Sequence, residues 1–275
     1  MNTKNMKNHL YNKMNDWVAS IEDEQLRKKV WKNCFVTGGI FVSLLSEEKI
    51  HDYDIYIMDK QVLIDLIRYY LIYVNNKDNT SMEVSTNSAK NGLVNIFIKS
   101  SGYYHNIEKG KNRKNYAPKY ISSNAITLYD GIQLITRFYG SPSEIHKNFD
   151  FIHCTCYYVP STNELYLPSD ALVSIINKEL HYVGSRYPIC SLFRMRKFMK
   201  RGWIINAGQI VKMAYQISKL DLDDFTVFED QLVGVDTLYF AAFISEMKKQ
   251  REESPMSFIL NETAVSKIID KVFGE

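Results

Sequence analysis

The sequence has no apolar run long enough to cross a membrane. A membrane-spanning helix needs about 20 consecutive apolar residues, whereas the densest apolar stretches, residues 40–45 and 171–176, are far shorter. Residues 1–14 are rich in asparagine and lysine and lack the apolar segment of a secretory signal. These absences predict a cytoplasmic protein with no transmembrane segment and no membrane partner.

Cysteine is also scarce, with four residues in a chain of 275. Cys154 and Cys156 are two positions apart in a predicted strand, and a disulfide between such close neighbours would be strained. We therefore expect reduced thiols. The alternative is a zinc site that also uses His153, but a Cys-x-Cys pair lacks the second ligand pair of structural zinc sites.

The net charge of +3 is small, so the overall charge does not by itself indicate a nucleic-acid-binding protein. Basic residues are nevertheless concentrated in two segments, residues 105–120 and 194–201. Either segment could hold phosphate groups, and either could instead be a solvated loop or helix face. With 45% apolar and 24% charged residues, the composition is that of a globular protein with a core.

Apolar periodicity predicts an α+β protein. Helices are expected at residues 9–21, 24–32, 40–45, 61–74, 170–180, 189–201, 207–218, 235–249 and 264–272. Strands are expected at residues 34–37, 53–58, 94–99, 124–128, 131–138 and 149–159, with a tight hairpin turn at Asp130-Gly131. We expect a mixed β-sheet with flanking helices in residues 1–160, and a small all-helical domain in residues 161–275.

One combination of motifs indicates chemistry. Gly38-Gly39 ends the first predicted strand and precedes a short helix, and Asp52 and Asp54 lie at the start of the next strand. A glycine pair lets the backbone approach a phosphate because no Cβ is in the way, and a helix start offers N–H groups to anions. Residues two apart on a strand point the same way, so both aspartates can hold Mg²⁺ or Mn²⁺ that bridges a triphosphate.

In this order, the motifs resemble the polymerase β-like nucleotidyltransferase superfamily, and within it the head and neck of class II CCA-adding enzymes and bacterial poly(A) polymerases. Residues 38–45 followed by Asp52-Tyr53-Asp54 are similar to the glycine turn, first helix and metal-binding Asp-x-Asp of that family. Asp150-Phe151 resembles the block that touches the sugar of the incoming nucleotide, and residues 187–203 resemble the first neck helix.

The resemblance implies a metal-dependent enzyme that transfers a nucleoside monophosphate from a nucleoside triphosphate (NTP), such as ATP, to a hydroxyl and releases pyrophosphate. It implies a tRNA-like RNA 3′ end as acceptor, with a protein or small-molecule hydroxyl as the alternative. The short helical region is more similar to compact, phage-type members than to full tRNA enzymes. We expect Asp52, Asp54 and Asp150 to be catalytic, the first two being the metal ligands, and we expect the nucleotide-binding residues to be Thr37, Gly38, Gly39, Ser43, Arg137, Tyr187 and Arg194.

Four positions of the predicted palm depart from the family pattern. Val42 and Ser43 stand where the first helix usually has an Arg-Asp pair, and Phe149 stands where an arginine usually precedes the Asp-Phe block. Gln133 occupies the place of a third acidic residue. The missing helix arginine and the absent third acid favour the alternative function, a noncatalytic palm that binds nucleotide or RNA and acts as an interaction or inhibitor module.

The predicted neck helix also departs from the pattern. Tyr187 and Cys190 stand where the family has the Asp and Arg that read the base of CTP or ATP. Because an aromatic ring stacks on any base, we expect Tyr187 to give relaxed or purine-leaning base choice.

Overall fold

The computed structural model describes residues 2–78, 84–88, 94–98, 103–104, 115–122, 124–222 and 224–232. The chain divides into two compact units between Asn177 and Lys178. The predicted basic residues at 105–114 and the predicted helices at 235–249 and 264–272 lie outside the described residues. The predicted α+β class is confirmed, because the first unit holds a mixed sheet with flanking helices and helices dominate the described part of the second.

The first unit is built on an eight-stranded sheet with the order β10-β9-β1-β2-β8-β7-β6-β5. Its strands are β1 (Cys34–Thr37), β2 (Tyr53–Ile57), β5 (Tyr103–Tyr104), β6 (Pro118–Ile121), β7 (Ala125–Leu128), β8 (Ile132–Tyr139), β9 (Tyr157–Val159) and β10 (Glu164–Tyr166). β2 and β8 are parallel, and the other pairs are antiparallel. β3 (Val84–Ser88) and β4 (Val94–Ile98) form a separate antiparallel pair.

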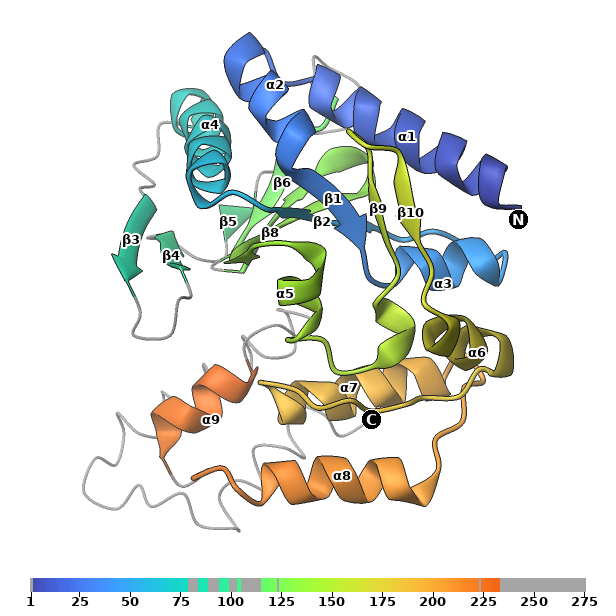
Figure 1. Cartoon of the computed structure of the whole chain (residues 1–275). Coiled ribbons are helices and arrows are strands. Elements are labelled where there is room, and N and C mark those ends of the chain that lie inside the picture. The colour runs from blue at the N-terminus through green and yellow to red at the C-terminus, as the bar shows by residue number, and fades with distance from the viewer. Residues whose placement is uncertain are drawn as a thin grey trace, which may run out of the picture. The chain divides into compact units, whose positions relative to one another are not determined.

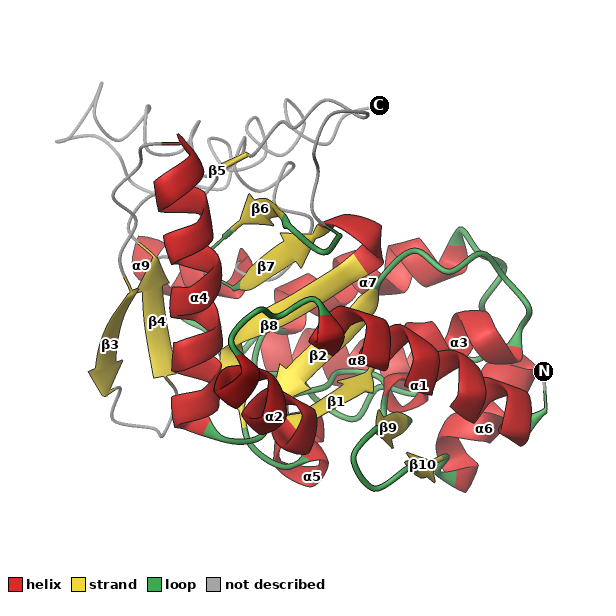
Figure 2. Ribbon diagram, turned by 90° about the horizontal axis from the view of Figure 1, so that it is seen from above, coloured by secondary structure: helices red, strands yellow, loops and turns green. Residues whose placement is uncertain are grey.

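Helices α1 (Thr3–Ala19), α2 (Glu24–Asn33) and α4 (Lys60–Asp78) cover one face of this sheet (Figures 1 and 2). Val36, Ile55 and Leu134 are directly opposite one another on β1, β2 and β8, and all three are fully buried. The helices add fully buried residues to this core, among them Leu10, Met14, Trp17, Leu63, Leu66, Ile67 and Val74. Burial of this apolar surface fixes which way each strand faces, since a shift of one residue would expose the whole set.

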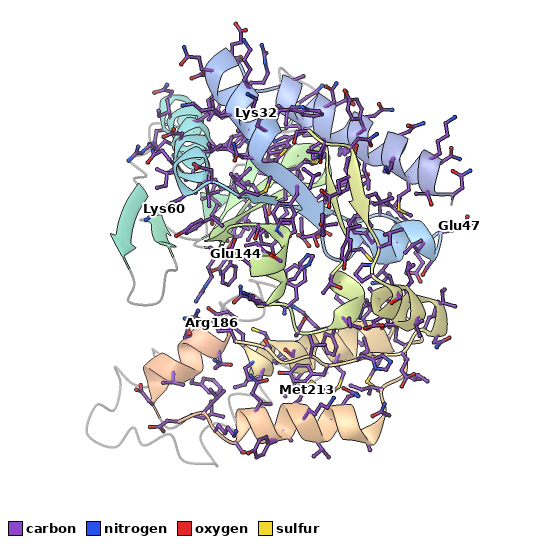
Figure 3. The ribbon with its side chains drawn as sticks, viewed as in Figure 1. Lys32, Glu47, Lys60, Glu144, Arg186 and Met213 are labelled. Carbon is purple, nitrogen blue, oxygen red and sulfur yellow. The ribbon has the colours of Figure 1, made fainter. Side chains whose placement is uncertain are left out.

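The opposite sheet face is partly covered by α5 (Pro142–His146) (Figure 1). Phe35 and Tyr56 are directly opposite on β1 and β2, and they form an apolar cluster with Ile145 of α5 and Val159 of β9. α5 begins with a capping box, in which the side chain of Glu144, labelled in Figure 3, accepts the backbone N–H of Ser141. The helix therefore has a defined start and a defined place on this face.

The predicted strand at residues 149–159 is wrong over most of its length. Only Tyr157–Val159 is a strand, and Ile152–Cys154 forms a short 3₁₀ helix. Local hydrogen bonds explain the difference: the N–H of Cys154 donates to Phe151 O and the N–H of Thr155 to Ile152 O, in place of a neighbouring strand.

The hairpin between β7 and β8 is confirmed as antiparallel, with a wider turn than predicted. Tyr129–Gly131 forms a 3₁₀ turn in which Asp130 (φ 64°) and Gly131 (φ 81°) both have positive φ. Pairing of β9 with β1 keeps the chain in the first unit well beyond Pro160, through β10 and α6 (Ser169–Asn177). The domain boundary predicted near Pro160 remains a prediction.

The described part of the second unit contains α7 (Pro188–Met199), α8 (Ala207–Ile217) and α9 (Phe225–Leu232). Met213 of α8, labelled in Figure 3, is fully buried, and Phe198 of α7 packs edge-on against the ring of Trp203. The N–H of Leu180, before α7, donates to the carbonyl oxygen of Ile204, before α8, and this hydrogen bond joins the two segments. Within the ranges that the structure describes, no helix is long and apolar enough to cross a membrane.

Candidate nucleotide and metal site

A row of polar side chains crosses the sheet on the face that carries α5. Thr37 of β1 is directly opposite Asp54 of β2, and Asp54 is directly opposite Gln133 of β8. Directly opposed residues point to the same face, on strands about 4.8 Å apart. Tyr53 points the other way, where its hydroxyl lies 2.7 Å from Nε2 of His9 on α1. Asp54 is therefore directed away from the helix-covered face, as strand alternation also predicts for Asp52.

Gly38 and Asp54 are in close contact. Gly38 has φ +84°, and a Cβ added there would lie 2.8 Å from Oδ2 of Asp54. The carboxylate of Asp54 thus lies against the α-carbon of Gly38, in space that any other residue would fill. The Gly38 N–H donates to the carbonyl oxygen of Cys154 at 3.2 Å, which ties the turn to the segment before β9. Two independent reasons, the positive φ and the space, require glycine here.

Gly39 lies in a different environment from its neighbour. Its φ is −63°, a value open to any residue, and nothing lies within 4 Å of the position that its Cβ would take. The backbone at Gly39, one residue after the glycine that contacts Asp54, therefore borders open space. Space of this kind lets an anionic group approach the main chain.

The hydroxyl of Thr37 is held inside the protein. Thr37 is fully buried, and its Oγ1 lies 2.7 Å from Cys156 O, 3.2 Å from Cys154 O and 2.8 Å from Nε2 of His146. The sequence suggested Thr37 as a nucleotide-binding residue. In the structure its hydroxyl contacts only these protein groups, and a role for Thr37 in nucleotide binding remains a prediction.

His146 was not identified from the sequence. Its ring lies on α5 between Phe149 and Tyr157, with centroid distances of 4.9 and 5.8 Å. Burial lowers the pKa of His146 to about 4, so the ring is neutral at neutral pH. No local pattern links residue 146 to Thr37, and only the packing of α5 brings them together.

The buried His146 predicts a dependence of stability on pH. The unfolded chain binds a proton here near the ordinary pKa of 6.5, whereas the folded chain does so only near 4. Stability contributed by the neutral ring is therefore complete above pH 6.5 and is lost as the pH falls towards 4. In urea unfolding at pH 7 and pH 4.5, the wild type should lose more stability on acidification than His146→Phe; an equal loss in both proteins would contradict the assigned burial.

Three further predicted site residues belong to the first unit. Asp150 is 3% exposed and Ser43, in α3 (Ile40–Leu45), is 6% exposed. Arg137 lies on β8 and donates from Nη1 to Oδ1 of Asn124 at 3.1 Å. A role for these three side chains in nucleotide binding remains a prediction.

The two predicted nucleotide-binding residues of the second unit lie in and just before α7. Tyr187 is the N-cap residue of α7 and is 7% exposed, and Arg194 is half-buried. The nearby Cys190 is buried and its Sγ donates to Gln231 O of α9 at 2.8 Å. A base could stack on Tyr187 only if its surroundings opened, because stacking needs an exposed ring face.

The donor set at Asp52 and Asp54 fits magnesium. Mg²⁺ is typically held by one or two carboxylates together with substrate phosphates and waters. Asp52 is exposed and Asp54 half-buried, so their hard oxygen ligands are accessible to such an ion. Across the described ranges there is no group of three or more His, Cys, Asp or Glu residues that could hold a metal, and so the zinc site considered at His153, Cys154 and Cys156 is not found.

Comparison with known proteins gives one family and a set of distant structural neighbours. A family model described as Gabija anti-defense 2 family protein matches residues 8–178, which is nearly the whole first unit. The solved structure of the Thermotoga maritima CCA-adding enzyme complexed with tRNA is 11% identical, with a TM-score of 0.42, and the match covers 93% of this chain and 58% of that one.

A second neighbour is the Bacillus stearothermophilus CCA-adding enzyme in complex with CTP. It is 16% identical, with a TM-score of 0.41, and the match covers 82% of this chain and 49% of that one. The chain thus spans less than two thirds of the length of either enzyme. Similarity at this level concerns the fold and not the activity. The comparison with curated proteins gives no match.

Proposed function

The chain belongs to the Gabija anti-defense 2 family, and from this premise we propose that its first unit is a metal-dependent nucleotidyltransferase whose activity counteracts the Gabija defence. It transfers a nucleoside monophosphate from an NTP to a hydroxyl acceptor and releases pyrophosphate. One observation carries the proposal: the Asp54 carboxylate lies against Gly38, and the next residue of the turn, Gly39, borders open space.

The proposed reaction assigns each of these groups a task. The acceptor oxygen forms a bond to the α-phosphorus, the bond from that phosphorus to the bridging oxygen breaks, and the acceptor proton passes to solvent. Asp52 and Asp54 would hold a divalent cation, which supplies charge stabilisation for the phosphate oxygens. The open space at Gly39 admits phosphate oxygens next to this carboxylate. Positioning and charge provide most of the rate in phosphoryl transfer.

An RNA 3′ end is the proposed acceptor. This choice rests on the sequence resemblance to RNA-tailing enzymes and on the basic residues of α7. Arg196 and Lys197, near the end of that helix, and Lys200, which follows it, are exposed. Exposed cations of this kind bind nucleic-acid phosphates without reading the sequence.

The acceptor can be identified directly. The purified protein is incubated with each of the four NTPs, labelled at the α-phosphate, in the presence of total RNA or alone. We expect label that is sensitive to nuclease and depends on added RNA. Label that is sensitive to protease and independent of RNA would identify a protein hydroxyl instead.

Gly39→Val tests whether phosphates approach this turn. The added side chain would occupy the open space at Gly39 without meeting protein atoms at its Cβ. We expect NTP affinity to fall about tenfold, equivalent to about 1.4 kcal/mol, with little change in thermal stability. Titration with a non-hydrolysable NTP measures this effect, and unchanged affinity in the folded variant would move the phosphate site elsewhere.

A second candidate function is noncatalytic inhibition of the defence system. It is favoured by Gln133, which is directly opposite Asp54 where a further carboxylate would strengthen a metal site. Phage survival in cells that carry the Gabija system separates the two candidates. The enzymatic proposal expects Asp52→Asn to abolish protection at an unchanged protein level, because this exposed residue has no part in the core. Full protection by that variant would favour the noncatalytic function.

A further inference from the structure

We propose that His146 is a positioning residue, which fixes the glycine turn through Thr37 and thereby seats the Asp54 carboxylate for metal binding. The inference rests on the proposed function in one respect, the binding of a divalent metal by Asp54. It assigns His146 no contact with the nucleotide.

The hydroxyl of Thr37 can donate only one hydrogen bond, so its neighbours determine which way each bond runs. Its hydroxyl has one hydrogen and three polar neighbours, two of which are carbonyl oxygens that can only accept. The shorter distance, 2.7 Å, selects Cys156 O as the acceptor. If the hydroxyl donated to His146 instead, two oxygen atoms would face each other at this distance without a hydrogen between them. Nε2 of His146 therefore carries the hydrogen and donates to Thr37 Oγ1 at 2.8 Å.

Thr37 is connected to Asp54 both through the sheet and through the glycine turn. Thr37 is directly opposite Asp54 in the sheet and directly precedes Gly38 in the chain. Gly38 in turn provides the surface against which Oδ2 of Asp54 lies. A shift of Thr37 would consequently move both the strand partner of Asp54 and the glycine beside its carboxylate.

His146 is itself held in place by the start of α5 and by neighbouring rings. α5 follows Gly140, whose N–H donates to Ile57 O at the end of β2 and whose φ of 131° suits glycine. The capping box of Ser141 and Glu144 then fixes the start of the helix. The ring of His146 is further held by Phe149 and Tyr157. α5 therefore holds the imidazole at a set distance from β1. Residues that orient metal ligands are commonly held in place in this way.

The test measures Mn²⁺ affinity by titration at pH 7.5, without any substrate. His146→Phe keeps a ring between Phe149 and Tyr157 but removes the donor, and we expect about tenfold weaker binding, in the range found for residues that orient metal ligands. His146→Gln keeps an N–H donor at a similar reach and should stay within about twofold of the wild type. Ile145→Val is the matched control, because it perturbs the buried face of the same helix and leaves the Thr37 contacts in place.

Two further variants approach the same hydrogen bond from its other end. Thr37→Val removes the hydroxyl and should weaken Mn²⁺ binding as His146→Phe does, whereas Thr37→Ser keeps the hydroxyl and should bind as the wild type. This pair decides the question even if His146→Phe does not fold.

Asp54→Asn separates the outcomes. If it binds Mn²⁺ as tightly as the wild type, the metal site is wrong and the proposed function is lost with it. If Asp54→Asn loses Mn²⁺ while folded His146→Phe and Thr37→Val both keep wild-type affinity, the positioning role is overturned and the proposed function stands. Weakened binding in both variants, with recovery in His146→Gln and Thr37→Ser, is the result that we expect.

Discussion

Asp54→Asn is expected to lower NTP turnover by at least about 10³-fold and to leave the fold intact. The substitution replaces a charged metal ligand by a neutral amide of the same shape, and such a ligand contributes several kcal/mol to stabilising charge in phosphoryl transfer. Its side chain is half-buried and Asp54 does not belong to the buried core, so we expect the core to be unaffected. Steady-state turnover at saturating Mg²⁺ measures the loss, and circular dichroism with thermal unfolding reports the fold.

Asp16→Asn is the matched control for charge. Asp16 is an exposed carboxylate on α1, which covers the opposite face of the sheet. Its replacement changes the net charge equally and should leave turnover within about twofold, because surface charges far from a site are largely screened. Turnover by Asp54→Asn equal to that by Asp16→Asn would show that chemistry does not occur at Asp54.

Gly38→Ala is expected to reduce both stability and metal binding. The positive φ of +84° costs an alanine about 1–2 kcal/mol, and the added Cβ would meet Oδ2 of Asp54 at 2.8 Å. The carboxylate would have to move, because the terminal atoms of a side chain shift more easily than the backbone does. We expect a melting temperature lower by several degrees and Mn²⁺ affinity weaker by about tenfold.

Gly39→Ala provides the comparison within the same turn. Its φ of −63° suits alanine, and nothing lies within 4 Å of the added Cβ. The melting temperature and the Mn²⁺ affinity should both stay close to those of the wild type. If both glycine variants behaved alike, the contact between Gly38 and Asp54 would have no part in shaping the site.

Local sequence was sufficient to predict the secondary structure around the candidate site. Cys34–Thr37 and Ile40–Leu45 have the predicted bounds, because a short β-branched and aromatic run, two glycines and an apolar hexamer each favour one local structure. Strand alternation similarly predicted the direction of Asp54. The sequence did not reveal which of the two glycines contacts the carboxylate, since that depends on backbone dihedral angles and strand register.

The contacts that the sequence could not predict are long-range. His146 meets Thr37 only because Gly140 and the capping box set α5 on the sheet face. The strand predicted over residues 149–159 does not form before Tyr157, because the N–H groups of Cys154 and Thr155 donate to carbonyl oxygens three residues earlier. Tyr187 has the chemistry of a stacking residue, but its side chain is buried, with 7% of the residue exposed.

The most direct test of nucleotidyl transfer compares one NTP labelled at its α-phosphate with the same NTP labelled at its γ-phosphate. With Mg²⁺ and the acceptor RNA, we expect the α-label to become attached to the acceptor and the γ-label to be released in pyrophosphate, and we expect Asp54→Asn to do neither. Transfer of the γ-label to the acceptor, or release of pyrophosphate that is unchanged in Asp54→Asn, would contradict nucleotidyl transfer at Asp54.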